Sequence, residues 1–246
     1  MKDIIWITSA SIKNNLRSRI TVIVVLATLL ICAVGLAATF SIVLIKPEMK
    51  ALSPDQSRLE MSLSLILSVT SLLGLGINLN AFAFQILTRE KAKGIIQSLL
   101  ATPLKEKDIW LGKSLAIFLP GLIVGEMLTL TALVSLNYIF FVPRIGFLIN
   151  PWIILSNFVA IPLMYLSLSL LVYLIGLIGK PATSNVIAII FLSGIITVVI
   201  NLVIRSILDA TSWTYFLVNV GIAAIIGIIT LLLLPRLEKE RIVLSS

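Results

Sequence analysis

Few residues in this sequence are able to carry out chemistry. The chain has no histidine, which excludes histidine metal ligands, Ser-His-Asp triads and histidine proton relays. The one cysteine, Cys32, lies in an apolar run, where a small buried side chain is a better interpretation than a reactive thiol. A single cysteine also excludes an intrachain disulfide framework. The sequence therefore lacks the acid–base pairs and metal ligands that an intramembrane enzyme would need.

Two glycine-lysine sequences resemble the end of a phosphate-binding loop, but neither is complete. A Walker A loop requires G-x-x-x-x-G-K-[ST]. The G-K-S at 112–114 ends correctly, but position 107 is lysine instead of glycine, and the G-K at 179–180 is followed by proline. We therefore expect this chain to bind no nucleotide and to hold no metal or cofactor of its own.

A single carboxylate, Glu126, lies near the middle of a long apolar segment. A charge there costs roughly 2.5–3.5 kcal/mol, so the side chain must face protein, water or a partner, or be protonated. Two interpretations remain open: a substrate or coupling residue, and a structural hydrogen bond to a neighbouring helix. Asparagines in other apolar segments are further candidates for lining a transport pathway, although two of them, only two positions apart, face different sides of a helix. They are Asn78, Asn80, Asn185 and Asn201.

The segments that position these residues are those of a membrane protein. Of the 246 residues, 59% are hydrophobic and only 12% are charged. Apolar runs long enough to cross a hydrocarbon layer of roughly 30 Å are predicted to be helices, because lipid offers the backbone no hydrogen-bond partner. We therefore expect an all-α polytopic protein, a single transmembrane domain over 1–246. Its six spans are predicted at about 20–45, 61–88, 114–142, 151–178, 182–204 and 212–235.

The basic residues indicate how these spans are oriented. Fourteen of the 19 lysines and arginines flank the spans on the side of the two termini, and five lie on the other side. The positive-inside rule therefore places both termini and the polar segment 89–113 in the cytoplasm. The formal net charge of +8 is explained by this distribution, and nucleic acid is not an expected partner.

Local signals mark several helix ends. The S-P-D-Q at 53–56 has a cap and a proline at the first helical position and can start span 2, and Asn150-Pro151 can start span 4 in the same way. Apolar residues recur at helical spacing over 1–19, which predicts a helix lying in the cytoplasmic interface; the alternative is a basic flank that only orients span 1. Residues 181–212 exceed one span, and the surplus, with Arg205 and Asp209 four residues apart, could form a short outer re-entrant helix.

The polar segment 89–113 is predicted to be a helical hairpin. Residues 90–101 form an amphipathic helix, with Glu90, Lys93, Gly94 and Gln97 on the face opposite the apolar one. Thr102 then caps a second helix that has Pro103 at its first position. The apolar face consists of Ala92, Ile95, Ile96, Leu99 and Leu100. On geometry alone, an ordinary interfacial loop helix and a mechanical element that transmits force to spans 2 and 3 are both open.

This segment resembles the signature of ABC-2-type transporter permeases. Residues 89–104 read REKAKGIIQSLLATPL and are followed by Gly112-Lys113, and the family has a similar R-E-x-x-x-G-T-x-E-x-L-x-x-T-P between spans 2 and 3. Ile95 stands where threonine is usual, and Gln97 where glutamate is usual. The resemblance implies a coupling helix that docks on an ATPase subunit. The docking residues would be Arg89, Glu90, Lys93, Gly94, Gln97, Leu99, Leu100, Thr102 and Pro103.

The resemblance also implies a function and partners. We expect a permease subunit in a prokaryotic plasma membrane, most simply an exporter of a hydrophobic or amphipathic substrate such as a drug, lipid or peptide. Two cytosolic ATPase subunits would bind the ATP and Mg²⁺, and a second permease chain, identical or different, would complete the assembly. The alternative is a stand-alone ion-coupled carrier, which would be expected to have more charge inside the membrane.

Overall fold

The computed structural model of the chain describes residues 2–17, 19–50, 55–79, 85–205 and 207–244. These residues are overwhelmingly helical and include no strand. Six helical stretches are long and apolar enough to cross a membrane, which confirms the predicted all-helical class and number of apolar helices. The stretches are Ile23–Lys50, Gln56–Asn78, Glu106–Phe141, Pro151–Ile178, Pro181–Ile204 and Trp213–Arg236.

Several of the long stretches contain a π-helical turn. The first consists of α2 (Arg19–Phe40), η1 (Ser41–Ile45) and α3 (Lys46–Lys50), and the second is α4 (Gln56–Asn78). The third is α7 (Glu106–Leu136) with η3 (Asn137–Phe141), and the fourth is α8 (Pro151–Leu155), η4 (Ser156–Ala160) and α9 (Ile161–Ile178). The last two are α10 (Pro181–Ile204) and α11 (Trp213–Leu233), which ends in the 3-10 turn η5 (Leu234–Arg236). The shorter helices are α1 (Lys2–Leu16), α5 (Gln85–Ala92), α6 (Ile95–Leu100) and α12 (Lys239–Leu244).

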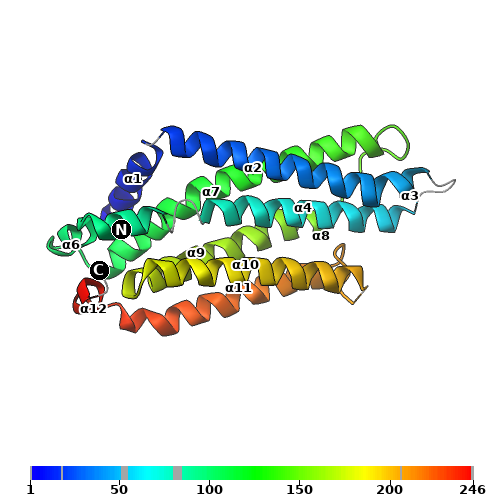
Figure 1. Cartoon of the computed structure of the whole chain (residues 1–246). Helices are drawn as coiled ribbons and strands as arrows, with labels where there is room; N and C mark the ends of the chain where they lie inside the picture. Colours follow the sequence, from blue (N-terminus) through cyan, green and yellow to red (C-terminus); the bar gives the residue numbers. More distant parts are fainter. Residues whose placement is uncertain (1, 18, 51–54, 80–84, 206, 245–246) are drawn as a thin grey trace.

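The long helices form an elongated bundle, and both termini lie at one end of it (Figure 1). The short helices α1, α6 and α12 gather at this end, whereas α3 and the start of α8 lie at the opposite end. We call these the terminal end and the far end. The segment between α4 and α7 is therefore on the same side of the bundle as the termini, as an even number of crossings requires.

Two of the long helices make up most of the core. Within the most apolar window of each stretch, 72% of the α4 residues and 61% of the residues in α8–η4–α9 are buried, against 11% for α2–α3 and 22% each for α10 and α11. A helix that stays apolar while it is mostly exposed needs lipid or another protein around it. The outer helices therefore expose apolar surface of the kind that contacts lipid or another protein.

Small residues allow α4 and α7 to pack closely. A Cβ atom on Gly74 would lie 3.5 Å from the Cα atom of Gly125, and one on Gly125 would lie 2.7 Å from Cδ2 of Leu75. Membrane helices commonly use small residues in this way, because close backbone approach increases van der Waals contact. The glycines thus explain why α7 lies directly against the buried helix α4.

The start of α8 is confirmed, and the start of α4 is corrected. Asn150 caps α8 by accepting a hydrogen bond from the Trp152 amide at 2.9 Å, with proline at the first helical position. The helix α4 begins at Gln56, capped by Asp55, whose side chain accepts from the Ser57 amide at 3.0 Å. An aspartate in this position satisfies the amides of the first turn directly. The predicted cap and proline, Ser53 and Pro54, lie outside the described residues.

The re-entrant helix expected before the last span is not found in residues 207–212. Oδ1 of Asp209 accepts hydrogen bonds from the amide of Thr211 at 2.8 Å and from its hydroxyl at 2.7 Å. Such a local bond from an aspartate favours a turn over a helix. The surplus residues therefore form a tight turn that leads directly into α11.

Candidate functional site

The segment between α4 and α7 folds as a hairpin of two short helices, α5 and α6. The single helix predicted over 90–101 is wrong, because the chain breaks at Gly94. The backbone of Gly94 has φ +68°, a left-handed conformation, and its amide donates to the Lys91 carbonyl at 3.0 Å. Glycine adopts this conformation without a Cβ clash, so it can end α5 and start α6 within a few residues.

The turn between α6 and α7 also differs from its prediction. The Thr102 hydroxyl donates to the Leu99 carbonyl, so this side chain closes the end of α6 instead of capping α7. The helix α7 starts only at Glu106, with Lys105 in the cap position. Glu106 and Asp108 lie in its first turn as predicted, where negative charge stabilises the helix dipole.

An ion pair inside the protein fastens the base of the hairpin. The Lys113 ammonium on α7 donates to Oε1 of Glu90 on α5, and both side chains are buried. Oε2 of Glu90 is also buried and has no hydrogen-bond partner among the described residues, and the same is true of the Tyr173 hydroxyl. The prediction that Glu90 lies on the outer, docking face is therefore wrong. Glu90 shares the inner face of α5 with the buried Leu87, because the two are three residues apart on a helix.

A second contact ties the hairpin to the end of α9. The Lys91 ammonium donates to the Gly179 carbonyl at 2.7 Å. Carbonyls at the end of a helix lack intrahelical partners and carry partial negative charge, so a lysine is a suitable partner. Burial lowers the pKa of the Lys91 ammonium from 10.5 to about 8. The hairpin is thus attached to both α7 and α9 through adjacent residues of α5.

The outer surface of the hairpin remains free of these contacts. Of the predicted docking residues, Arg89, Lys93, Gln97 and Pro103 are exposed. Gly94, Leu99 and Thr102 are half-buried, and Glu90 and Leu100 are buried. The predicted apolar face is only partly buried, since Ile96 is 1% exposed whereas Ile95 is 37% exposed. The hairpin therefore presents cationic and amide side chains together with apolar ones, of which Ile95 is the largest.

Two of the predicted pathway residues, Asn78 and Asn201, bond to their own helices and not to each other. Asn78 is buried, and its amide donates to the Gly74 carbonyl of its own helix at 2.8 Å. Asn201 is exposed and donates to the Thr197 carbonyl at 2.9 Å, while Asn185 is half-buried. Asn80 lies outside the described residues. Bonds of an amide to its own helix satisfy the side chain without forming a shared site.

Glu126 is the exception among these candidates. The side chain is half-buried on α7, and its Oε1 atom is buried without a hydrogen-bond partner in the part of the chain that the structure describes. The structural hydrogen bond to a neighbouring helix, one of the two interpretations of this residue, is therefore not seen among those residues. A group of this kind is available to a ligand or to a partner chain.

A cluster of buried polar side chains in the far half of the bundle was not predicted from the sequence. The Tyr215 hydroxyl on α11 donates to Ser68 on α4 at 2.8 Å, and the Ser68 hydroxyl donates to Oδ1 of Asn157 on η4 at 2.9 Å. All three side chains are almost completely buried. The available signal was the presence of tyrosine and asparagine inside apolar spans, where polar groups face the bundle interior. Spacing alone could not show that the three residues meet.

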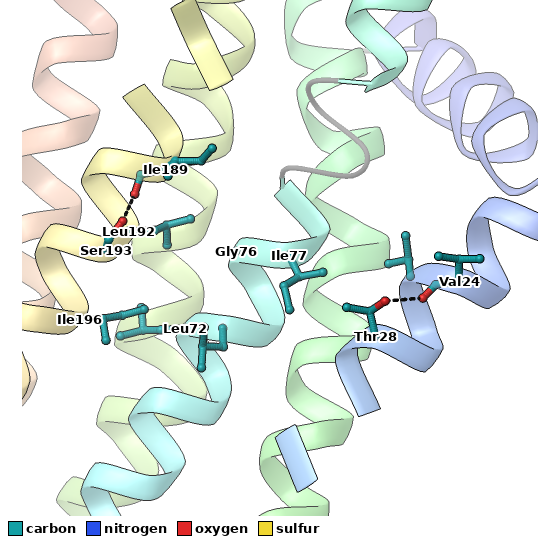
Figure 2. Close-up of a pocket in the computed structure, with 11 residues that line it drawn as sticks. Val24, Thr28, Leu72, Gly76, Ile77, Ile189, Leu192, Ser193 and Ile196 are labelled. Carbon is teal, nitrogen blue, oxygen red and sulfur yellow. Dashed lines mark hydrogen bonds between the residues drawn. The ribbon is translucent and has the colours of Figure 1, made fainter. Parts of the chain in front are cut away.

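An apolar groove of about 540 Å³ runs between α2, α4 and α10 (Figure 2). Its two hydroxyl groups, on Thr28 and Ser193, donate to carbonyls of their own helices, so the walls offer no free donor. The groove is therefore suited to an apolar occupant, and the predicted pathway residues that the structure describes do not line it. The lining residues include Val24, Thr28, Leu72, Gly76, Ile77, Ile189, Leu192, Ser193 and Ile196.

Comparisons of the chain with protein-family models, with curated proteins and with solved structures gave no match. The function must therefore be argued from the hairpin and its attachment to the bundle.

Proposed function

We propose that this chain is the membrane subunit of an ATP-binding cassette transporter of the ABC-2 permease type. The observation that carries the proposal is the hairpin α5–α6 at the terminal end, exposed on its outer side and held on its inner side by Glu90–Lys113 and Lys91–Gly179. A loop that only connects two spans can do so without a buried ion pair. A loop that transmits movement to two helices requires firm attachment to them, and the buried ion pair provides it.

The attachment supports a mechanism in which a push on the hairpin moves the bundle. Two cytosolic ATPase subunits bind ATP and Mg²⁺, and their ATP-driven closure presses on the exposed face around Lys93 and Gln97. The force reaches α7 through Lys113 and the end of α9 through Gly179. Access to a cavity between this chain and a second permease chain then changes from one side of the membrane to the other.

The exposed apolar surfaces support a hydrophobic or amphipathic substrate, exported from the cytoplasmic side of a prokaryotic plasma membrane. The groove between α2, α4 and α10 has apolar walls, its Thr28 and Ser193 hydroxyls are bonded to their own helices, and two of its three helices, α2 and α10, are mostly exposed. Drugs, lipids and apolar peptides have matching surfaces. The terminal end, with its excess of basic residues, is the cytoplasmic end under the positive-inside rule.

A co-purification experiment tests the proposal. The tagged chain is expressed with the ATPase encoded beside it, purified in nanodiscs and assayed for bound ATPase and vanadate-sensitive hydrolysis. The variant Ile95→Asp places a charge on the outer side of the hairpin, where the side chain is 37% exposed. Its matched control is Ile145→Asp, at the far end, where the side chain is 40% exposed.

We expect the wild type and Ile145→Asp to retain an active ATPase, and Ile95→Asp to lose it. A chain that binds no ATPase in detergent or nanodisc contradicts the proposal, and the stand-alone carrier then becomes the better interpretation. Equal loss in both variants would show that the effect does not come from the hairpin.

A further inference from the structure

A second groove, of about 520 Å³, lies between the N-terminal helix α1 and the start of α7. Its walls are mostly apolar. The Thr8 hydroxyl on its α1 wall is bonded to the carbonyls of Ile4 at 2.7 Å and Gly112 at 3.1 Å. The groove therefore suits a chain of methylene groups better than a polar ligand. The walls include Ile4, Ile5, Thr8 and Ile12 from α1 and Leu115 and Leu119 from α7.

The groove exists because α1 contacts α7 closely at one point. A Cβ atom on Gly112 would lie 2.8 Å from Cγ2 of Ile7, so only glycine permits this approach. One and two turns further along α7, Leu115 and Leu119 line the groove. The hollow is thus a fixed feature of how the two helices cross.

The groove opens onto a surface that faces lipid in a membrane protein. Leu119 is 37% exposed, and the same side of α7 continues with Ile123 and Met127, which are 61% and 62% exposed. These residues follow one another at intervals of four, so they form one continuous apolar strip. An acyl chain lying along the strip reaches the groove without leaving an apolar environment.

The rim of the groove is positively charged, in contrast to its apolar walls. Lys13 borders it, and Arg17 comes directly after the end of α1 at Leu16. Both side chains are exposed, and within the described ranges neither forms an ion pair. Trp6, 66% exposed, lies on the same side of α1, and tryptophan is typical of the boundary between lipid and water. Two free cations at this level complement an anionic headgroup.

We propose that the groove between α1 and α7 binds an anionic phospholipid, with one acyl chain between Ile12 and Leu119 and the phosphate at Lys13 and Arg17. The apolar walls suit an acyl chain, and the two cations, which form no ion pair among the described residues, suit an anionic headgroup. The exposed apolar strip on α7 gives the lipid a route into the groove. The bound lipid braces α1 against the turns of α7 that follow Lys113. This inference requires only that the chain lies in a membrane, and it is independent of the ATPase.

Native mass spectrometry of the purified, delipidated chain tests the site. The chain is titrated with dioleoyl phosphatidylglycerol and, separately, with dioleoyl phosphatidylcholine. A basic residue near an anionic lipid surface contributes about 1 kcal/mol, so Lys13→Gln should weaken phosphatidylglycerol binding about fivefold and Lys13→Gln/Arg17→Gln about 25-fold. Lys46→Gln removes an exposed lysine at the far end and should bind as the wild type does.

A second pair of variants tests the acyl chain. Ser9 lines the groove, so Ser9→Trp fills it, whereas Ala10→Trp adds the same group to an exposed position that does not line the groove. Ser9→Trp should abolish the preferred binding, and Ala10→Trp should keep it. Phosphatidylglycerol should also raise the melting temperature of the wild type and not of the double variant, because a ligand stabilises only a chain that binds it.

Three results would overturn the proposal. The first is unchanged phosphatidylglycerol binding by Lys13→Gln/Arg17→Gln. The second is an equal loss in Lys46→Gln, which would indicate a general charge effect. The third is full binding by Ser9→Trp, or displacement of the lipid by inorganic phosphate, which would show that the groove does not hold the acyl chain.

Discussion

Glu90 on α5 and Lys113 on α7 form an ion pair whose side chains are only 3% and 9% exposed. They are 23 residues apart, and the whole turn of the hairpin lies between them. A buried pair of this kind costs desolvation energy that a surface loop would not need to spend. Its consequence is geometric: α5 cannot move without moving the start of α7.

Removing one partner of this pair should destabilise the protein strongly. Lys113→Met leaves the Glu90 carboxylate buried without its cation, and Glu90→Gln leaves the ammonium without its anion. Each should lower the free energy of unfolding by about 3–5 kcal/mol. Thermal or chemical unfolding in nanodiscs measures the effect.

The double variant Glu90→Gln/Lys113→Met is the control. It removes both charges, so its loss of stability should be well below the sum of the two single losses. Strictly additive losses would contradict a direct interaction between the two side chains.

Gly94→Ala should weaken the hairpin, because alanine in a left-handed conformation costs about 1–2 kcal/mol. The added Cβ atom would also lie 3.1 Å from Oε1 of Gln97. Gly146→Ala is a matched control, since Gly146 has φ +87° in a turn at the far end with no atom near the new Cβ. Both variants should lose similar stability, but only Gly94→Ala should reduce ATPase binding in the co-purification assay. A reduction of equal size in Gly146→Ala would contradict a role for the hairpin turn.

Lys91 should make stability depend on pH in a defined window. Its pKa is about 8 in the folded chain against 10.5 for an ordinary lysine. Between these values the unfolded chain binds more protons than the folded one, so stability should rise with pH. Below about pH 8 both forms are protonated, and Lys91 contributes no pH dependence.

To test this, the free energy of unfolding of the wild type and of Lys91→Met is measured from about pH 7 to about pH 10.5, and the difference between the two proteins is followed. The difference should shift in favour of the wild type as the pH rises through the window. Lys93→Met, which removes an exposed lysine from the same hairpin, should show no such shift. A flat difference for Lys91→Met would contradict the burial of this ammonium.

Ser68→Ala should cost more stability than Tyr215→Phe. Ser68 lies between two partners, so its loss leaves both the Tyr215 hydroxyl and Oδ1 of Asn157 unpaired, at about 1–2 kcal/mol. Tyr215→Phe removes one donor and leaves the bond from Ser68 to Asn157 in place, at about 0.6 kcal/mol. Ser193→Ala, which removes an exposed hydroxyl bonded to its own helix, should be nearly neutral. The reverse order in unfolding experiments would show that the three residues do not act as a chain.

Glu126→Gln should impair transport while the assembled complex remains intact. The substitution keeps the size of the side chain and removes its ability to ionise. Oε1 of Glu126 has no hydrogen-bond partner among the described residues, so the substitution breaks no bond of that atom. Transport into inverted vesicles and the amount of bound ATPase measure the two effects separately. Full transport by the variant would exclude a role for Glu126 in the pathway.

Much of the fold was predictable because helices of membrane-spanning length are recognisable in a sequence as long apolar runs. Six apolar stretches, the cap at Asn150 and the acidic first turn of α7 all follow from local chemistry. The errors occurred where two local signals competed. The amphipathic pattern predicts that Gly94 lies within a helix, although it separates two helices, and proline at 103 predicts that Thr102 caps the next helix, although its hydroxyl closes the helix before it.

The candidate site was predictable only as a segment. The sequence identified the polar segment 89–113 and its residues. It could not predict which side chains face inward, because a helical wheel places every residue around one straight axis. The break at Gly94 ends that axis, and packing against α7 and α9 then decides the inner face of α5. Glu90 and Lys91 are consequently buried, although both are charged.

The sequence by itself determined what its local patterns require: helices of membrane-spanning length, an excess of basic residues on one side, and the absence of histidine chemistry. The tertiary structure alone decided which distant side chains meet. Lys113 with Glu90, Lys91 with Gly179, and Ser68 with Asn157 and Tyr215 are pairings between separate helices. Lipid requires each helix to satisfy its own backbone, so the helices are local, but the partners of polar side chains depend on how the helices rotate and pack against one another.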